Sequence, residues 1–101
     1  CYTGPAASPA SDCSGFINKF CNSVDPEPVR LHDNNSRCYN LPNGNRCDFI
    51  AYNTYQNNIS PSGTNCKFVL QNVTNACNFG GSGQREPGAY TFSVDLNIGA
   101  C

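Results

Sequence analysis

The sequence predicts an α+β fold, in which the antiparallel sheet of a single disulfide-rich domain is covered by two helices. Two segments place apolar residues at helical spacing, several shorter segments alternate apolar with polar residues as strands do, and eight cysteines are spread along the chain. A length of 101 residues suits one compact domain rather than two. One domain spanning residues 1–101 is therefore expected.

The first predicted helix follows an irregular arm, residues 1–10. Six apolar or cysteine residues from Cys13 to Val24 recur at steps of three and four, which is the spacing of one face of an amphipathic helix. Ser11 or Asp12 can cap its start, because a short oxygen-bearing side chain accepts hydrogen bonds from the open backbone N–H groups. Asp25-Pro26 ends it, since proline disfavours helical backbone in the residue before it.

A short strand, a turn and a hairpin are predicted next. Val29 and Leu31 alternate with polar residues, which indicates a strand, and the polar run 33–36 is typical of a turn. Asn43-Gly44 then lies between two segments predicted as antiparallel strands. Asn-Gly is a strong hairpin signal, because both residues tolerate positive φ. The two strands cover residues 38–41 and 46–52.

The second predicted helix opens at Ser60-Pro61, because proline suits the first turn of a helix. Apolar and cysteine residues from Cys66 to Cys77 again recur at steps of three and four, and Gly80-Gly81 is predicted to end the helix. Residues 79–88 are predicted as a glycine-rich loop.

The last predicted element is a strand from Tyr90 to Leu96. Apolar and polar residues alternate throughout it, as expected of a half-buried strand. Strands with one apolar face and helices with one apolar stripe fit a two-layer packing.

The cysteines predict a disulfide framework. An even number in a short chain indicates four bridges in an oxidising compartment, and the absence of a C-x-x-C spacing argues against a zinc ribbon or a thioredoxin-type site. Cysteines within one helix cannot pair here: at 1.5 Å per residue, Cys13 and Cys21 would lie about 12 Å apart, and Cys66 and Cys77 about 16 Å apart. Both distances exceed the roughly 7 Å that a bridge spans. Many pairings stay open among Cys1, Cys13, Cys21, Cys38, Cys47, Cys66, Cys77 and Cys101.

The charge composition excludes some partners. Six Lys or Arg residues balance seven Asp or Glu residues, so neither nucleic-acid binding nor electrostatic membrane binding is expected. No apolar run approaches the roughly 18 residues that span a bilayer, so membrane insertion is not expected.

Several features predict secretion. The absence of Met and the start at Cys1 suggest that a secretory signal has been removed. Three sequons predict N-glycosylation in a eukaryotic host, at Asn34, Asn58 and Asn72.

The sequence contains no recognisable catalytic motif, and the protein is expected not to be an enzyme. The single histidine, His32, lies beside Asp33 and is interpreted as a surface or partly packed residue. A small ribonuclease would need a carboxylate, a histidine and an arginine around a phosphate, for which His32, Arg85 and either Glu27 or Glu86 are candidates. None of the acidic residues forms a glycosidase motif.

No metal or cofactor is expected. Asp95-x-Asn97-x-Gly99 lacks the downstream glutamate of a calcium loop, and the run 80–83 lacks the lysine and the helix of a phosphate-binding loop.

The polar loop after the hairpin is a candidate sugar site. Tyrosine offers a flat ring for the apolar face of a sugar, and asparagine offers a donor and an acceptor to its hydroxyl groups. The loop that carries Arg85 and Glu86 could face it. The candidate contacts are Tyr52, Asn53, Tyr55, Asn57, Arg85 and Glu86.

Several segments resemble a family of small secreted fungal glycan-binding proteins, typified by one from the shaggy ink-cap mushroom. The similarity covers most of the chain after residue 11 and is carried by 12–21, 46–49, the helix from Asn65-Cys66, Cys77 with Gly80-Gly81, and 90–101. The resemblance implies an α/β domain with four disulfides and lectin-like recognition of a fucosylated GalNAc-GlcNAc glycan on a glycoprotein or cell surface.

Two other functions are weighed against glycan binding. One is a killer-type toxin or effector acting on a membrane or protein target, and the other is a small ribonuclease. The oligomeric state is left open, with a homodimer as one option.

Overall fold

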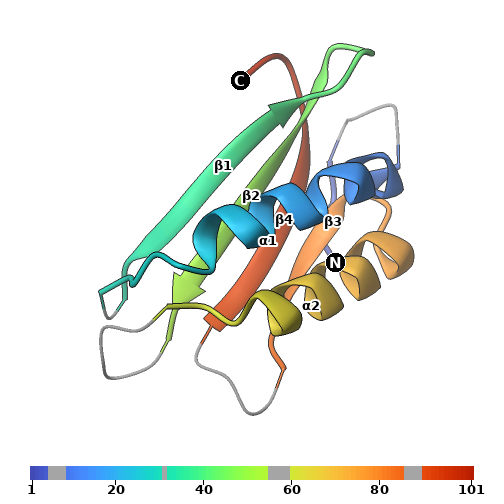
Figure 1. Cartoon of the computed structure of the whole chain (residues 1–101). Coiled ribbons are helices and arrows are strands. Elements are labelled where there is room, and N and C mark those ends of the chain that lie inside the picture. The colour runs from blue at the N-terminus through green and yellow to red at the C-terminus, as the bar shows by residue number, and fades with distance from the viewer. Residues whose placement is uncertain (5–8, 31, 55–59, 86–89) are drawn as a thin grey trace.

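Helices and sheet form two layers (Figure 1). The structure is a computed structural model that describes residues 1–4, 9–30, 32–54, 60–85 and 90–101. The two α-helices lie on one face of a four-stranded sheet, which confirms the predicted α+β class with an antiparallel sheet covered by two helices. In chain order the elements are the 3-10 helix η1 (Ala10–Phe16), α1 (Ile17–Val24), β1 (Asn34–Asn40), β2 (Asn45–Asn53), α2 (Gly63–Ala76), β3 (Gly80–Gly83) and β4 (Tyr90–Ile98).

The sheet has the order β1-β2-β4-β3, and every neighbouring pair is antiparallel. Alternate residues of β2 and β4 are buried, beginning with Asn45 and Tyr90, so each of these strands has one face toward the helices. Burial raises the pKa of the Tyr90 phenol, while a hydrogen bond with the Val29 backbone lowers it to a smaller extent. In the described residues no helix has the length and hydrophobicity needed to cross a membrane.

The core lies between the helices and the inner face of the sheet. Phe20 of α1 stacks on Phe49 of β2 with ring centroids 5.0 Å apart, and both side chains are fully buried. Leu70 of α2 and Phe92 and Val94 of β4 complete the same cluster. Burial of such side chains contributes roughly 1.5–3 kcal/mol each relative to exposure.

Four disulfides join the elements, and all eight cysteines are paired. Neither of the two pairs that helical geometry forbids is formed, as predicted. Two bridges are buried in the core, where Cys13–Cys47 joins η1 to β2 and Cys21–Cys66 joins α1 to α2. The other two, Cys1–Cys77 and Cys38–Cys101, tie down both ends of the chain.

The first predicted helix is present but divided. Its first part is the 3-10 helix η1, and regular α-helix begins only at Ile17. Capping by Ser11 or Asp12 was a wrong prediction, because both residues lie inside η1 and no side chain caps its start. The end before Asp25-Pro26 is confirmed. Asp25 also contacts the start of the second helix, where its Oδ2 accepts a hydrogen bond from the Gly63 backbone N–H at 3.2 Å.

The interpretation of residues 29–36 was wrong in two respects. Val29 makes an isolated bridge rather than a strand, and His32 has a φ of 61°, which interrupts extended backbone, while Leu31 of the predicted strand lies outside the described residues. Residues 34–36 of the predicted turn at 33–36 are instead the start of β1, where Asn34 pairs with Tyr52 and Ser36 with Ile50. Pairing with a long neighbouring strand outweighs the local turn preference of asparagine and serine.

The hairpin between β1 and β2 is confirmed, with a different turn geometry. Gly44 alone among its turn residues has positive φ, at 84°, and Asn43 does not. The Gly44 N–H donates to the Leu41 carbonyl at 3.4 Å, and the Leu41 N–H donates to the Asn45 carbonyl at 2.9 Å. This is the pattern of a three-residue loop in which a type I turn is followed by a left-handed glycine.

The second helix starts later than predicted. Ser62 is its N-cap and accepts from the Asn65 N–H at 3.2 Å, so Pro61 precedes the helix rather than lying in its first turn. The helix ends at Ala76, before the predicted stop at Gly80-Gly81. These glycines begin β3, so the prediction of a loop over 79–88 was wrong for residues 80–83. The predicted last strand is confirmed as β4.

Candidate functional site

The face of the sheet opposite the helices, here called the outer face, is uncovered in the described part of the chain (Figure 1). It consists of the strand residues that alternate with the buried ones. Most of these are polar; those of β1 and β3 are exposed, and those of β2 and β4 are half-buried except Ile50. They are Asn34, Ser36, Cys38 and Asn40 of β1, Arg46, Asp48, Ile50 and Tyr52 of β2, Ser82 of β3, and Thr91, Ser93, Asp95 and Asn97 of β4.

A hollow of about 570 Å³ lies on the outer face and is here called the sheet hollow. Its volume is in the range of small-molecule binding sites. Arg37 and Phe49 line it with their backbone, because their side chains lie on the inner face, where Phe49 is buried and Arg37 pairs with Glu27 at 3.2 Å. The full lining is Tyr2, Ser36, Arg37, Cys38, Asp48, Phe49, Ile50, Ser93 and Asp95.

Tyr2 gives the sheet hollow an aromatic wall. Its backbone N–H donates to the Gly80 carbonyl at 2.8 Å, and the neighbouring Cys1 is bridged to Cys77. The arm is thereby held beside the edge strand β3. Tyr2 is 38% exposed and Ile50 is 37% exposed, so both present apolar surface to solvent. An aromatic ring beside hydroxyl and carboxylate groups is the combination that suits a sugar.

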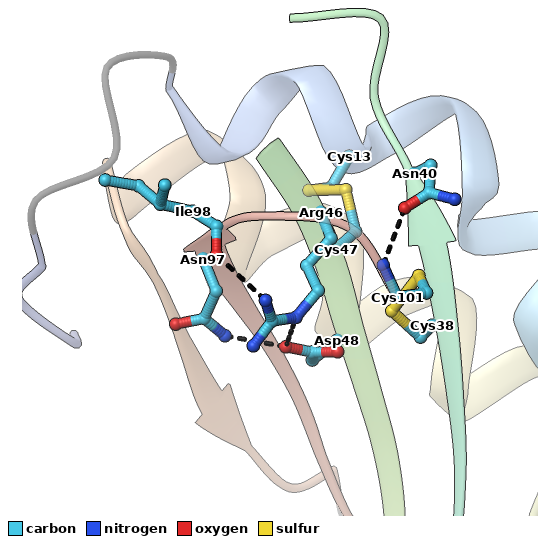
Figure 2. The surroundings of a disulfide bond; sticks show 9 residues. All are labelled: Cys13, Cys38, Asn40, Arg46, Cys47, Asp48, Asn97, Ile98 and Cys101. Carbon is cyan, nitrogen blue, oxygen red and sulfur yellow. Dashed lines mark hydrogen bonds and ion pairs between the residues drawn. A yellow bond between two sulfur atoms is a disulfide. The ribbon is translucent and has the colours of Figure 1, made fainter. Parts of the chain in front are cut away.

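Asp48, which lines the sheet hollow, is the centre of a group of hydrogen-bonded side chains (Figure 2). Asp48 Oδ2 accepts from Arg46 Nε at 3.0 Å and from Asn97 Nδ2 at 2.7 Å, while Arg46 Nη1 donates to the Ile98 carbonyl at 2.8 Å. These bonds link β2 to β4 and fix the orientation of the Asp48 carboxylate. Asp95 lies directly opposite Asp48 in the register.

The structure separates the predicted sugar contacts. Tyr52 lies on the outer face, two positions beyond Ile50, and its ring is nearly parallel to that of His32 with centroids 6.4 Å apart. Asn53 is fully buried, and its Nδ2 donates to the Val29 carbonyl at 2.7 Å. Its side-chain amide therefore stabilises the fold and does not face solvent. Three of the predicted contacts lie outside the described residues: Tyr55, Asn57 and Glu86.

Arg85 lies against the helical layer. Its guanidinium is over the ring of Phe68, an exposed residue of α2, at 3.9 Å from the centroid. The neighbouring Gln84 donates from Nε2 to Thr54 Oγ1 at 3.1 Å. Thr54 after β2 and Gln84 after β3 therefore lie side by side, but Tyr52 lies on the outer face and Arg85 lies against α2.

Two acidic residues close to His32 in the sequence are bonded to other groups in the structure. Glu27 accepts from Arg37 and from Asn35 Nδ2, rather than lying with His32. Asp33 Oδ1 accepts from the Asn34 N–H. Among the described residues, no group of three or more His, Cys, Asp or Glu side chains is placed to hold a metal ion. The run 80–83 is a strand, and so is the segment containing Asp95 and Asn97.

Two of the three sequon asparagines are described. Asn34 is exposed at the start of the edge strand β1, on the outer face. Asn72 is exposed on α2, where its Nδ2 donates to the Phe68 carbonyl at 2.9 Å. Asn58 lies outside the described residues.

Comparison with known proteins identifies the family. The model of the family described as "glycan binding domain Y3" matches residues 12–101. The chain belongs to the glycan-binding domain Y3 family. It is also similar to the antiviral protein CAP of Coprinus comatus, with 44% identity over 92 residues, which cover 88% of this chain and 90% of that protein. The protein is thus a fungal-type, lectin-like glycan-binding protein, as the resemblance implied.

The Y3 match also bears on the sheet hollow. It includes all four strands and both α-helices, but it begins after Tyr2. Sequence reasoning missed the lining residues of this site. Strand alternation places Asp48 and Ile50 on one face with Tyr52, and this pattern could have revealed them. No local pattern could have revealed Tyr2, because a backbone hydrogen bond and a disulfide bring it to the sheet.

Proposed function

We propose that the protein is a secreted, non-catalytic lectin that binds a fucosylated, GalNAc-containing glycan in the sheet hollow. The observation that carries the proposal is the Y3 family match combined with an open hollow of about 570 Å³. A sugar ring stacks on Tyr2, and its hydroxyl groups donate to Asp48 and Asp95. A longer glycan extends along the outer face to Tyr52. The contacts at Tyr55, Asn57 and Glu86 remain part of the proposal.

Secretion and a role in defence belong to the same proposal. Four disulfides are typical of proteins that fold in an oxidising compartment. The similar protein from Coprinus comatus is named as antiviral. A lectin of this family would act in defence by binding glycans on the surface of an attacker. Growth inhibition that competing sugars fail to relieve would instead favour a toxin or effector.

The first test is a glycan array probed with the folded protein. Binding is expected to concentrate on fucosylated glycans that contain GalNAc, because the family is glycan-binding and the resemblance implies this ligand. Folding is checked beforehand by a cooperative thermal transition. An array on which the folded protein binds neither fucosylated nor GalNAc-containing glycans would contradict the proposal.

The second test places the site with two aromatic truncations. Tyr2→Ala is expected to weaken glycan binding about 30-fold in calorimetric titration, because truncating a packed aromatic at a binding site costs about 2 kcal/mol or more. Phe68→Ala is the matched control, since Phe68 is an exposed aromatic of the helical layer. It is expected to bind as the wild type does. The opposite ranking of the two variants would move the site to the helical layer.

A further inference from the structure

The two carboxylates of the sheet hollow differ in their surroundings. Asp48 and Asp95 lie directly opposite each other on β2 and β4, where the Cβ atoms of facing residues are typically 4.5–5.5 Å apart. Like charges in facing positions destabilise a sheet. The negative charge of Asp48 is offset by its ion pair with Arg46 and by the hydrogen bond that it accepts from Asn97. The Asp95 carboxylate has neither a hydrogen bond nor an ion pair with any described residue.

The unpaired carboxylate faces a hollow whose two neighbouring arginines are both engaged with other groups. Arg46 is turned to Asp48 and the Ile98 carbonyl, and the Arg37 guanidinium lies on the inner face with Glu27. Asp95 is half-buried and lines the sheet hollow beside the Ser93 hydroxyl. The sheet thus keeps an unpaired carboxylate facing Asp48 at the position where a ligand would bind, and cost to stability at a binding site is characteristic of functional residues.

We infer that the sheet hollow selects uncharged glycans and that Asp95 is the residue that sets this selection. A carboxylate is an acceptor only, so it bonds well to sugar hydroxyls. A carboxylate or sulfate on a sugar is also an acceptor, and it would be repelled by Asp95 with no cation to offset the repulsion. Sialylated and sulfated glycans are therefore excluded. This inference rests on the proposed function, because it concerns the same hollow.

Calorimetric titration with a matched pair of glycans tests the inference. The probes are a fucosylated GalNAc-GlcNAc trisaccharide and the same trisaccharide carrying one sulfate. The wild type is expected to bind the neutral sugar at least about tenfold more tightly at low salt, and the ratio should shrink at high salt as charges are screened. Asp95→Asn is expected to weaken neutral binding about fivefold, since hydrogen bonds to a charged acceptor are stronger. In the same variant, the ratio of the affinity for the neutral sugar to that for the sulfated sugar should be close to one.

Thermal unfolding supplies a readout without ligand. Asp95→Asn is expected to raise the melting temperature by about 2–5 °C, because it removes the repulsion from Asp48. Asp12→Asn is the control, since it removes the same charge from the first turn of η1 and should neither change the binding ratio nor raise the melting temperature. An unchanged ratio in Asp95→Asn, or equal binding of both sugars by the wild type, would overturn the inference and leave the proposed function standing. Binding of neither sugar would overturn both.

Discussion

Replacing both Cys21 and Cys66 by alanine is expected to lower the free energy of unfolding by about 5 kcal/mol. The bridge joins α1 to α2 across 45 residues, and constraint of the unfolded chain by a loop of this length is worth about 4 kcal/mol. Both half-cystines are fully buried, so the variant also leaves a cavity between the helices that costs about 1–2 kcal/mol. Many domains of this size are stable by only about 5–15 kcal/mol in total.

The Cys38–Cys101 bridge is the matched control. It spans 63 residues, so its effect on the unfolded chain is again about 4 kcal/mol, but both of its cysteines are exposed. Urea unfolding of the two double-alanine variants is the measurement. The buried pair is expected to cost about 1–2 kcal/mol more than the exposed pair. Equal losses would show that packing around Cys21–Cys66 adds nothing to the constraint.

Gly80→Ala is expected to destabilise the protein by about 3 kcal/mol or more. Gly80 has a φ of 90°, a conformation that costs a non-glycine residue about 1–3 kcal/mol. A Cβ at this position would also collide with the Val94 carbonyl, forcing β3 away from β4 at a further cost of about 1–3 kcal/mol. The same shift would disturb the hydrogen bond that holds Tyr2 beside the sheet.

Gly44→Ala separates the two contributions. Gly44 has a similar φ of 84°, but no atom lies within 4 Å of the position its Cβ would take. This variant is expected to lose only the backbone term, about 1–2 kcal/mol. Chemical denaturation of both variants measures the difference. If Gly44→Ala proves as destabilising as Gly80→Ala, the close approach of β3 to β4 does not contribute to the loss of stability in Gly80→Ala.

The elements with a long regular pattern were predictable from the sequence. Apolar spacing around Phe20 and Leu70 marked both helices, because one stripe of each is buried against the sheet. Alternation over β4 marked the central strand for the same reason. The hairpin turn was predictable from Gly44, whose positive φ favours glycine.

The edge strands were not predictable. Asn34, Asn35 and Ser36 have turn-forming side chains, and they are extended because they pair with β2. Gly81 and Gly83 have no side chain that could indicate a strand. Their small size allows β3 to pack closely against Val73 and Val69 of α2. Such pairing depends on residues distant in the sequence, so local patterns do not report it.

The candidate site divides in the same way. Tyr52 lies on the outer face and stays a proposed contact, but Asn53 next to it is buried, because adjacent residues of a strand face opposite sides. The sheet hollow depends on three elements that meet in space: the arm with Tyr2, the β1–β2 pair and β4. Only the three-dimensional structure brings these together.

Chemical-shift mapping tests the central claim, which is that the protein binds its glycan on the outer face of the sheet. The fucosylated GalNAc-GlcNAc trisaccharide is titrated into the isotope-labelled protein, and each backbone amide is followed by NMR. The largest shifts are expected in the sheet hollow, at Tyr2, Ser36, Ile50 and Asp95. Shifts concentrated instead on α2 around Phe68, with none in the sheet hollow, would contradict the claim.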